Sequence, residues 1–397
     1  MIVAFTKDWD DVPTCTTHVL REMAKTMPVL WVSSIGTRKP SAASGKDLRR
    51  IVGRIRSGLK RAEWKENSLR VLKPILIPKA ETAFAKWLNR KLFAWYVRRE
   101  KRDMERGGQG PTVSHLKPES IEFWCFVPNA VDLLPRTKEG SVPCIVYYCA
   151  DDWGQFHNLD GAWMDAKERE LVQRADVVFV TSRFLERKLS GFRSHPSSLS
   201  PSPIHYLPHG VEYARFSQAL DKSQPIPADV AGLPKPVIGF YGNLHPWVDL
   251  DVVAFLAASR AQWSFVLIGE IYTNLDSLES LPNVHLLGRR EHCDLHTYCR
   301  AFDVAIIPYD MSNPRMESVN PVKTKELLGA GLPIVASEVP ELRNYGDDVL
   351  TCEGNDAWLS ALDRQVARRD QTAISERVRN ESWENKVATI RRIVDDG

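Results

Sequence analysis

Short apolar runs alternate with longer amphipathic stretches over the second half of the chain. The runs are rich in β-branched residues, as is typical of strands buried on both faces of a parallel sheet. Strands are predicted at 236–242, 264–269, 283–287, 303–307 and 333–337, with helices at 249–260, 294–301 and 322–331. Each strand–helix–strand unit indicates a right-handed crossover, and the series indicates a Rossmann-like sheet.

The first half shows the same pattern less regularly. Strands are predicted at 2–5, 29–32, 123–126, 144–148 and 177–181, which indicates a second Rossmann-like sheet. A stretch rich in Lys and Arg, about 38–110, interrupts the early strands and is hard to assign to helices or strands. A Ser/Pro-rich run at 194–203 is too polar to bury and predicts a surface loop near the domain boundary, with the hinge at 206–210.

The length of 397 residues supports two domains, since one domain usually takes about 100–200 residues. The predicted domains are 1–205, which contains the basic insertion, and 206–397. The last helix of the second domain could pack back on the first. The content of 43% hydrophobic and 26% charged residues is typical of a soluble globular protein. The predicted class is therefore α/β, with two Rossmann-like domains facing an interdomain cleft.

The charge balance and the cysteine content limit the partners and the cellular location that the chain could have. The 53 basic and 50 acidic residues are too evenly balanced for a nucleic-acid partner. The first residues lack the sections of a secretory signal, and no run of about 18 apolar residues occurs. Seven scattered cysteines indicate thiols of a reducing compartment. We therefore expect a cytoplasmic protein, with the inner face of the cell membrane as an alternative location.

The segment 46–65 combines eight basic and two acidic residues with apolar residues at helical spacing. This pattern suits a helix on an anionic membrane surface, where each basic residue contributes about 1 kcal/mol. The alternative is a helix packed on its own domain with a charged outer face. Peripheral membrane contact would suit a lipid-linked acceptor.

The segment 320–337 carries the strongest candidate chemistry. Pro321 can open a helix, because its missing N–H is not needed there. The free N–H groups of that first turn, with Val322 and Lys323, can bind a diphosphate. Glu326, one turn on, can accept hydrogen bonds from two neighbouring hydroxyls, as a ribose offers. The alternative is an ordinary amphipathic helix with a glycine stop.

This segment resembles the nucleotide-binding helix and following strand of the GT-B glycosyltransferases, and the likeness covers most of the chain. Further matching pieces are 208–212, 239–242 and 287–289. The resemblance implies that Glu326 holds the ribose and Lys323 the diphosphate of a nucleotide-sugar donor, UDP-linked rather than GDP-linked. It also implies that Gly242 and Asn243 line the diphosphate, with Arg289 as a further cation, and that no cofactor or metal is bound.

The chain departs from the retaining members of that family at two places. Ser318 stands where they carry a Glu, eight residues before Glu326, and Asn243, His245 and Trp247 stand where they carry an Arg/Lys pair. Both departures favour inversion.

Asp151 and Asp152 follow a predicted strand, at the sheet edge where such folds bind ligands. Their segment is similar to the Tyr-x-x-x-Asp stretch of the inverting glucuronosyltransferase of xanthan synthesis, which implies that Asp152 is the base and Asp151 a supporting group. The alternatives are a solvated turn and a cap for the helix over 163–173. His18, at the start of the first helix, is the rival base.

Two further sets have metal-ligand residue types. His292, Cys293, His296 and Cys299 could hold zinc, but a helix wraps four ligands poorly, so we interpret them as a helix surface. We interpret Asp249 and Asp251 as the cap of a helix rather than as a metal site.

The sequence therefore predicts a glycosyltransferase that moves a sugar from a nucleotide diphosphate to an acceptor hydroxyl, with inversion, in surface polysaccharide or glycolipid biosynthesis. The alternatives are a nucleotide-sugar epimerase of the same fold and a non-catalytic nucleotide-sugar-binding subunit.

Overall fold

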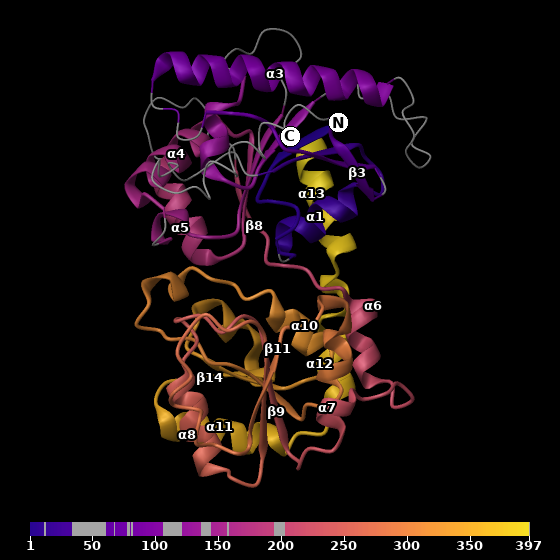
Figure 1. Cartoon of the computed structure of the whole chain (residues 1–397), viewed down its shortest axis with the longest axis vertical. Coiled ribbons are helices and arrows are strands. Elements are labelled where there is room, and N and C mark those ends of the chain that lie inside the picture. Colours follow the sequence, from indigo (N-terminus) through magenta and orange to yellow (C-terminus); the bar gives the residue numbers. More distant parts are fainter. Residues whose placement is uncertain are drawn as a thin grey trace, which may run out of the picture. The chain divides into compact units, whose positions relative to one another are not determined.

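The chain forms two α/β units, each built around one sheet (Figure 1). The computed structural model describes residues 1–11, 13–33, 61–66, 68–77, 80, 82–105, 121–135, 144–156, 159–193 and 203–396. One unit is Met1–Leu207 together with Val387–Gly397, and the other is Pro208–Lys386. The predicted class, with two Rossmann-like sheets, is confirmed.

The first unit has an eight-stranded sheet in the order β3-β4-β2-β1-β5-β6-β7-β8. Neighbouring strands are parallel, except that β3 runs antiparallel to β4. Its strands are β1 (Ile2–Phe5), β2 (Val29–Val32), β3 (Glu63–Glu66), β4 (Leu69–Leu72), β5 (Glu122–Cys125), β6 (Ile145–Cys149), β7 (Val177–Val180) and β8 (Ile204–Tyr206). All five strands predicted here are present.

The helix predicted over 46–65 is wrong at its end, because Glu63–Glu66 is strand β3. Pairing with the buried strand β4 supplies backbone hydrogen bonds that the local charge pattern does not reveal. Residues 46–60 lie outside the described residues, as do residues 194–202 of the expected surface loop.

The described helices of the first unit are α1 (Cys15–Met23), α3 (Ala83–Glu105), α4 (Gly161–Arg174), α5 (Arg183–Arg193) and the later part of α13 (Trp383–Asp396). One hydrophobic core includes Phe5 of β1, Phe93 of α3, Leu171 of α4 and Leu189 of α5. Helix α3 lies within the basic insertion, at residues for which the sequence predicted no element.

A buried ion pair attaches α3 to the sheet. Arg70 of β4 lies 3.0 Å from the carboxylate of Glu100, and that carboxylate also accepts a hydrogen bond from the Ala62 N–H at 3.3 Å. The Glu100 side chain is fully buried. The pair therefore fixes which face of α3 turns toward the core.

The second unit has a six-stranded, fully parallel sheet in the order β11-β10-β9-β12-β13-β14. Its strands are β9 (Val237–Tyr241), β10 (Ser264–Ile268), β11 (Val284–Gly288), β12 (Val304–Ile307), β13 (Ile334–Ser337) and β14 (Val349–Cys352). Its helices are α6 (Tyr213–Phe216), α7 (Ala228–Ala231), α8 (Leu250–Ser259), α9 (Leu295–Cys299), α10 (Lys323–Gly329), α11 (Asn355–Val366) and α12 (Gln371–Arg377). The five strands and three helices predicted here are present, and β14 was not predicted.

Helices cover both faces of this second sheet. Alternate side chains of β9 enter different cores, since Val237 and Tyr241 pack with α9 and α10 whereas Ile238 and Phe240 pack with α8 and α11. Polar side chains that could bind a ligand are therefore expected at the strand ends and in the loops that follow them.

The buried pair of Arg70 and Glu100 gives a prediction about stability. Replacing Glu100→Gln leaves the Arg70 charge buried without a full counter-charge, which should lower the free energy of unfolding by about 3 kcal/mol. Chemical denaturation measures the change. The control Glu63→Gln, at a largely exposed side chain, should change it by less than about 1 kcal/mol. Equal midpoints for the two variants would contradict this account of α3.

Candidate active site

Lys323, the first residue of α10, has an ammonium group with no counter-ion among the described residues. Its Nζ lies 4.3 Å from the ring centre of Phe240 and 5.6 Å from that of Tyr309. Part of the residue remains exposed, but the ammonium end is enclosed. Burial lowers the pKa of Lys323 to about 8, and the charge of Glu326 opposes this only in part. An enclosed cation of this kind favours the binding of an anion.

The loop after β9 closes directly over this ammonium group. Gly242 has a φ of +139°, and a Cβ atom at this position would lie 2.3 Å from the Lys323 Nζ. Only glycine fits such an approach without displacing the lysine. The next residue, Asn243, accepts a hydrogen bond from the Glu270 N–H at 3.4 Å. The structure thus brings Gly242 and Lys323 together, as the donor-site prediction requires.

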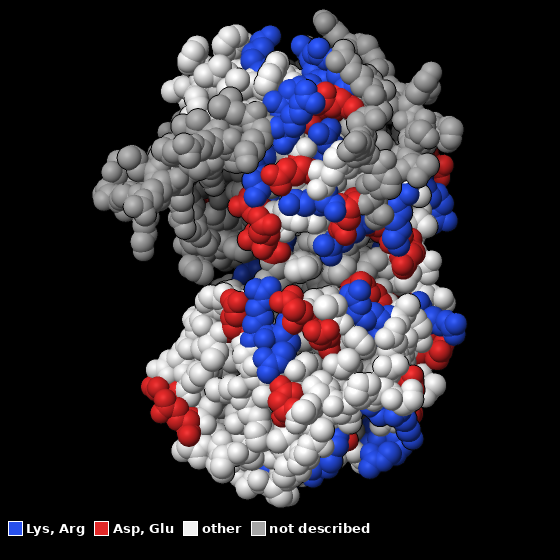
Figure 2. Space-filling model, turned by 45° about the vertical axis from the view of Figure 1, so that its right-hand side comes forward, with Lys and Arg blue, Asp and Glu red and all other residues white. Residues whose placement is uncertain are grey.

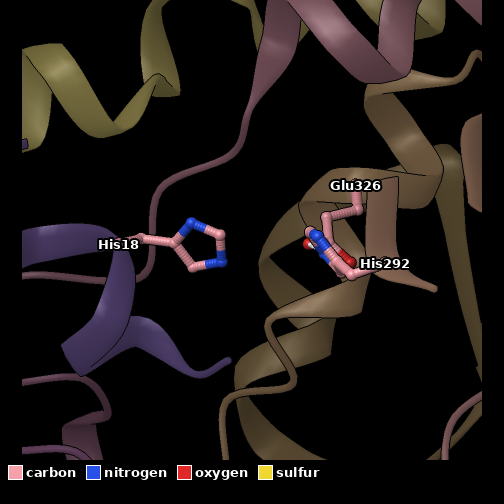
Figure 3. Close-up of side chains that lie close together, drawn as sticks. All are labelled: His18, His292 and Glu326. Atoms are coloured by element: carbon pink, nitrogen blue, oxygen red, sulfur yellow. Dashed lines mark hydrogen bonds and ion pairs between the residues drawn. The ribbon is translucent and has the colours of Figure 1, made fainter. Parts of the chain in front are cut away.

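Glu326 lies one turn further along α10 and is buried. Its Oε2 accepts a hydrogen bond from the Tyr241 hydroxyl at 2.8 Å, and its Oε1 lies 2.8 Å from the His292 Nε2. Figure 3 shows the His292 ring and the Glu326 carboxylate facing each other in the second unit; it also draws His18, which belongs to helix α1 of the first unit. Two protein groups therefore orient the carboxylate expected to bind ribose.

His292 is a site residue that sequence reasoning missed. It lies in the 3₁₀ turn His292–Asp294, with Glu212 3.5 Å from its Nδ1. Burial lowers the pKa of His292, but the hydrogen bond to Glu326 and the charges of Glu326 and Glu212 outweigh burial and raise it. In the sequence, His292 stood out only as one of four possible zinc ligands.

The structure pairs that histidine with a carboxylate rather than with the other three members of the proposed zinc set. Cys293 is exposed and Cys299 is buried, so the two thiols do not share one environment. The cap interpretation of Asp249 is confirmed, because its Oδ1 accepts a hydrogen bond from the Val252 N–H at 3.0 Å.

The remaining donor-site candidates lie at the predicted loops. The Pro321 carbonyl accepts a hydrogen bond from the Thr324 N–H at 3.0 Å, and Val322 is the residue before the helix. Arg289 follows β11 and lies 3.4 Å from Glu270 and 3.7 Å from Glu291. Two nearby carboxylates thus offset its charge, in contrast to Lys323.

In the first unit, Asp152 belongs to a partly buried ionic cluster around Lys188 of α5. The Lys188 Nζ lies 2.6 Å from Asp152 Oδ1, 2.9 Å from Asp165 Oδ1 and 2.9 Å from Glu168 Oε2. Burial lowers the pKa of Lys188, but the surrounding carboxylates outweigh it and raise the pKa. Burial raises the pKa of Glu168, although Lys188 opposes this. Sequence reasoning missed this lysine, which has no motif around it.

The three carboxylates have the residue types and spacing of a metal site, with one ligand atom of each within 4.8 Å of the others. The Lys188 ammonium lies among them and already supplies positive charge there. Within the described residues the Oδ2 atom of Asp152 accepts no hydrogen bond. Lys188 therefore fixes one oxygen of Asp152 and leaves the other available.

Asp151 and His18 are also placed at helix and strand ends in this unit. Asp151 is half-buried after β6, and His18 is buried in α1. Burial lowers the pKa of nearby Lys7, opposed by the charges of Asp11, Cys15 and Asp151. The cap of α4 is Asp160, whose Oδ1 accepts from the Trp163 N–H at 3.1 Å. Asp151 and Asp152 are thus not needed as its cap.

Known proteins resemble part of this chain in sequence and the whole chain in fold. Residues 235–368 match a family described as glycosyl transferases group 1. The chain superposes on HepE of Anabaena in complex with UDP and glucose, with a TM-score of 0.63, 13% identity, and coverage of 100% of this chain and 99% of that one. The chain has the GT-B glycosyltransferase fold.

A second GT-B structure, the sucrose-phosphate synthase of Thermosynechococcus elongatus, gives a TM-score of 0.65 at 14% identity, covering 100% of this chain and 98% of that one. In sequence, the chain is 28% identical over 208 residues to the putative teichuronic acid biosynthesis glycosyltransferase TuaH of Bacillus subtilis (strain 168). That match covers 49% of this chain and 51% of the relative, so it spans about half the length of each. The specific likeness to the xanthan enzyme stays a prediction.

The enclosed ammonium of Lys323 predicts an unusual pH dependence. Replacing Lys323→Met should raise the free energy of unfolding at pH 7 by about 1–3 kcal/mol, because it removes a desolvated charge. The gain should shrink as the pH rises from about 8 toward 10.5, where the wild-type lysine is neutral when folded but still protonated when unfolded.

Chemical denaturation at several pH values measures this gain. The exposed Lys222→Met serves as the control and should show no such trend. A Lys323→Met variant less stable than wild type at pH 7 would contradict the interpretation of an uncompensated charge.

Proposed function

We propose that this chain transfers a sugar from a UDP-linked donor to an acceptor hydroxyl with inversion at the anomeric carbon. The observation that carries the proposal is the enclosed ammonium group of Lys323, which lacks a counter-ion among the described residues and lies against Gly242. A diphosphate supplies the missing negative charge. The group 1 match over the same unit, and the UDP bound to HepE, support this assignment.

On the donor side, Lys323 would stabilise the charge that develops on the leaving diphosphate, together with Asn243, Arg289 and the N–H groups around Val322. Glu326, whose carboxylate is oriented by Tyr241 and His292, would accept hydrogen bonds from the ribose hydroxyls. The proposal uses no metal and no further cofactor.

On the acceptor side, Asp152 would take the proton of the hydroxyl as that hydroxyl attacks the anomeric carbon. Its hydrogen bond to Lys188 fixes the carboxylate and leaves Oδ2 to receive the proton. A single displacement needs one base and forms no covalent intermediate, so it inverts the anomeric centre. Asp151 would support this group, and His18 is the rival base.

The setting that we propose is assembly of a surface polysaccharide or glycolipid, on a lipid-linked acceptor at the inner face of the cell membrane. The name of the Bacillus subtilis relative, a teichuronic acid biosynthesis glycosyltransferase, supports this pathway class. Peripheral contact through 46–65 remains part of the proposal, and residues 46–60 lie outside the described residues. Among the described helices, none combines the length and the apolarity needed to cross a membrane.

Donor binding can be tested by calorimetry with UDP and UDP-sugars. Replacing Lys323→Met should weaken UDP binding by roughly 10- to 100-fold, because it removes a charged contact to the diphosphate. Lys222→Met should bind as wild type does. If the wild-type chain bound no UDP, GDP or dTDP compound, the donor assignment would be wrong.

The base can be tested by single-residue replacements with nuclear magnetic resonance of the products. The variant Asp152→Asn should bind UDP with unchanged affinity but transfer sugar at least about 100-fold more slowly to a panel of free and lipid-linked saccharides. The product should carry the anomeric configuration opposite to that of the donor.

Other outcomes would separate the alternatives. Loss of transfer in Asp151→Asn or His18→Gln, with Asp152→Asn fully active, would move the base to that residue. An altered sugar epimer formed from the donor alone would indicate an epimerase, and donor binding with no turnover would indicate a binding subunit.

A further inference from the structure

The outward face of helix α3 combines exposed aromatic and basic side chains. Phe84, Trp87 and Trp95 are 68%, 49% and 52% exposed, which is high for residues of this size. Lys91, Arg98 and Arg102 are exposed as well. These six positions, spaced three or four residues apart, form one stripe along the helix, which we call the α3 stripe. The stripe contains no acidic residue.

No carboxylate of the described residues neutralises the cations of the α3 stripe. Among the described residues, Lys91 and Arg98 form no ion pair, and Arg102 donates a hydrogen bond only to the Arg98 carbonyl at 3.4 Å. Other exposed arginines differ in this respect; Arg343 and Arg364, for example, each pair with a carboxylate. In Figure 2, Lys and Arg side chains gather along the upper edge, at the end where Figure 1 places α3.

The aromatic side chains of the stripe are ordered against the helix rather than folded into the core. The rings of Phe84 and Trp87 stack with centroids 5.9 Å apart. The Trp95 ring contacts Tyr96 edge-on at 5.0 Å and lies under the Arg99 guanidinium at 4.9 Å. These contacts keep large apolar surfaces outward in a fixed arrangement.

The opposite face of α3 is firmly attached to the first unit. Phe93, Tyr96 and Val97 belong to the hydrophobic core, and Glu100 pairs with Arg70. Asn89 adds two hydrogen bonds to the backbone of Ile77, at 2.8 and 2.9 Å. The helix therefore has no freedom to turn its aromatic side chains inward, where other side chains already hold it against the first unit.

We propose that the α3 stripe docks on an anionic lipid surface. Aromatic side chains prefer the boundary between lipid head groups and acyl chains, and uncompensated Lys and Arg side chains are attracted to anionic head groups. The two residue types share one face, so both would reach the same surface at once. Charge complementarity favours lipid over a second copy of this chain, because two α3 stripes would oppose like charges.

This surface differs from the segment 46–65, for which the sequence pattern offered membrane contact and packing on its own domain as alternatives. The α3 stripe would bring the first unit to a membrane where a lipid-linked acceptor is found, but the proposal does not rest on glycosyl transfer. Vesicle binding in the absence of any donor tests it separately from the proposed reaction.

The experiment is co-sedimentation of the full chain with vesicles of phosphatidylcholine with and without phosphatidylglycerol. We expect binding to the anionic vesicles, weakened when salt is raised from 0.1 M to 1 M, since the screening length falls from about 10 Å to about 3 Å. The triple variant K91Q/R98Q/R102Q should bind roughly 100-fold more weakly, at about fivefold for each lost cation. The pair W87A/W95A should bind at least about tenfold more weakly.

Matched controls separate the α3 stripe from general surface effects. The variants R343Q/R364Q/R379Q and Tyr272→Ala change exposed residues of the second unit and should bind vesicles as wild type does. Unfolding midpoints of all variants should match, because the changed side chains are exposed.

A second measurement, of tryptophan fluorescence, detects contact with lipid without requiring a variant that loses vesicle binding. Brominated lipids should quench tryptophan fluorescence of the bound wild-type chain, and W87F/W95F should still bind but show much less quenching. The proposal is overturned if the α3 variants bind vesicles as wild type does. It is also overturned if the wild-type chain forms a dimer without lipid that W87A/W95A dissociates, because a second copy would then cover the stripe.

Discussion

Helices cover both faces of the second unit's parallel sheet, so the ends of its strands are the places where polar groups can meet a ligand. Tyr241 at the end of β9 and the glycine that follows it lie directly beside the start of α10. This constraint gathers Lys323 and Glu326 at one sheet edge even though their neighbours come from segments far apart in sequence. The chemistry of the unit follows from which charges are paired at that edge and which are not.

Each unit holds a partly buried lysine, and the surroundings of the two ammonium groups are opposite in charge. In the second unit, Lys323 is enclosed by aromatic rings and its pKa is lowered. In the first unit, three carboxylates surround Lys188 and its pKa is raised. One environment has a deficit of negative charge and the other a surplus. The function that we propose would place the anionic donor in the first of these environments and the proton-accepting carboxylate in the second.

Much of the fold could be predicted from the sequence, because uninterrupted apolar runs such as 303–307 have few structural alternatives. The strands that were missed lack such runs. Strand β3 has the sequence Glu-Trp-Lys-Glu and is held at the sheet edge by pairing with β4. The three residues of β8 are only half-buried. Local pattern could not reveal strands whose stability comes from pairing.

The same distinction applies to the candidate site. Lys323 and Glu326 could be predicted because their spacing lies within one short segment. His292 and Lys188 could not, because each acts through a contact to a residue 34 or more positions away, without a motif of its own. Helix α3 was missed for another reason: aromatic residues lie on both of its faces, so its sequence does not show the usual apolar stripe.

The division of the last helix between the two units affects any attempt to dissect the chain. Helix α13 begins in the second unit, but Val387–Gly397 belong to the first, where Arg391 lies 2.7 Å from Glu122. That carboxylate also accepts a hydrogen bond from the Trp124 indole at 2.9 Å. A fragment ending at Leu207 would therefore lack the cation that neutralises Glu122. Residues 387–396 of the first unit follow the whole of the second unit along the chain, so the first unit acquires this helix segment only after the second unit has been synthesised.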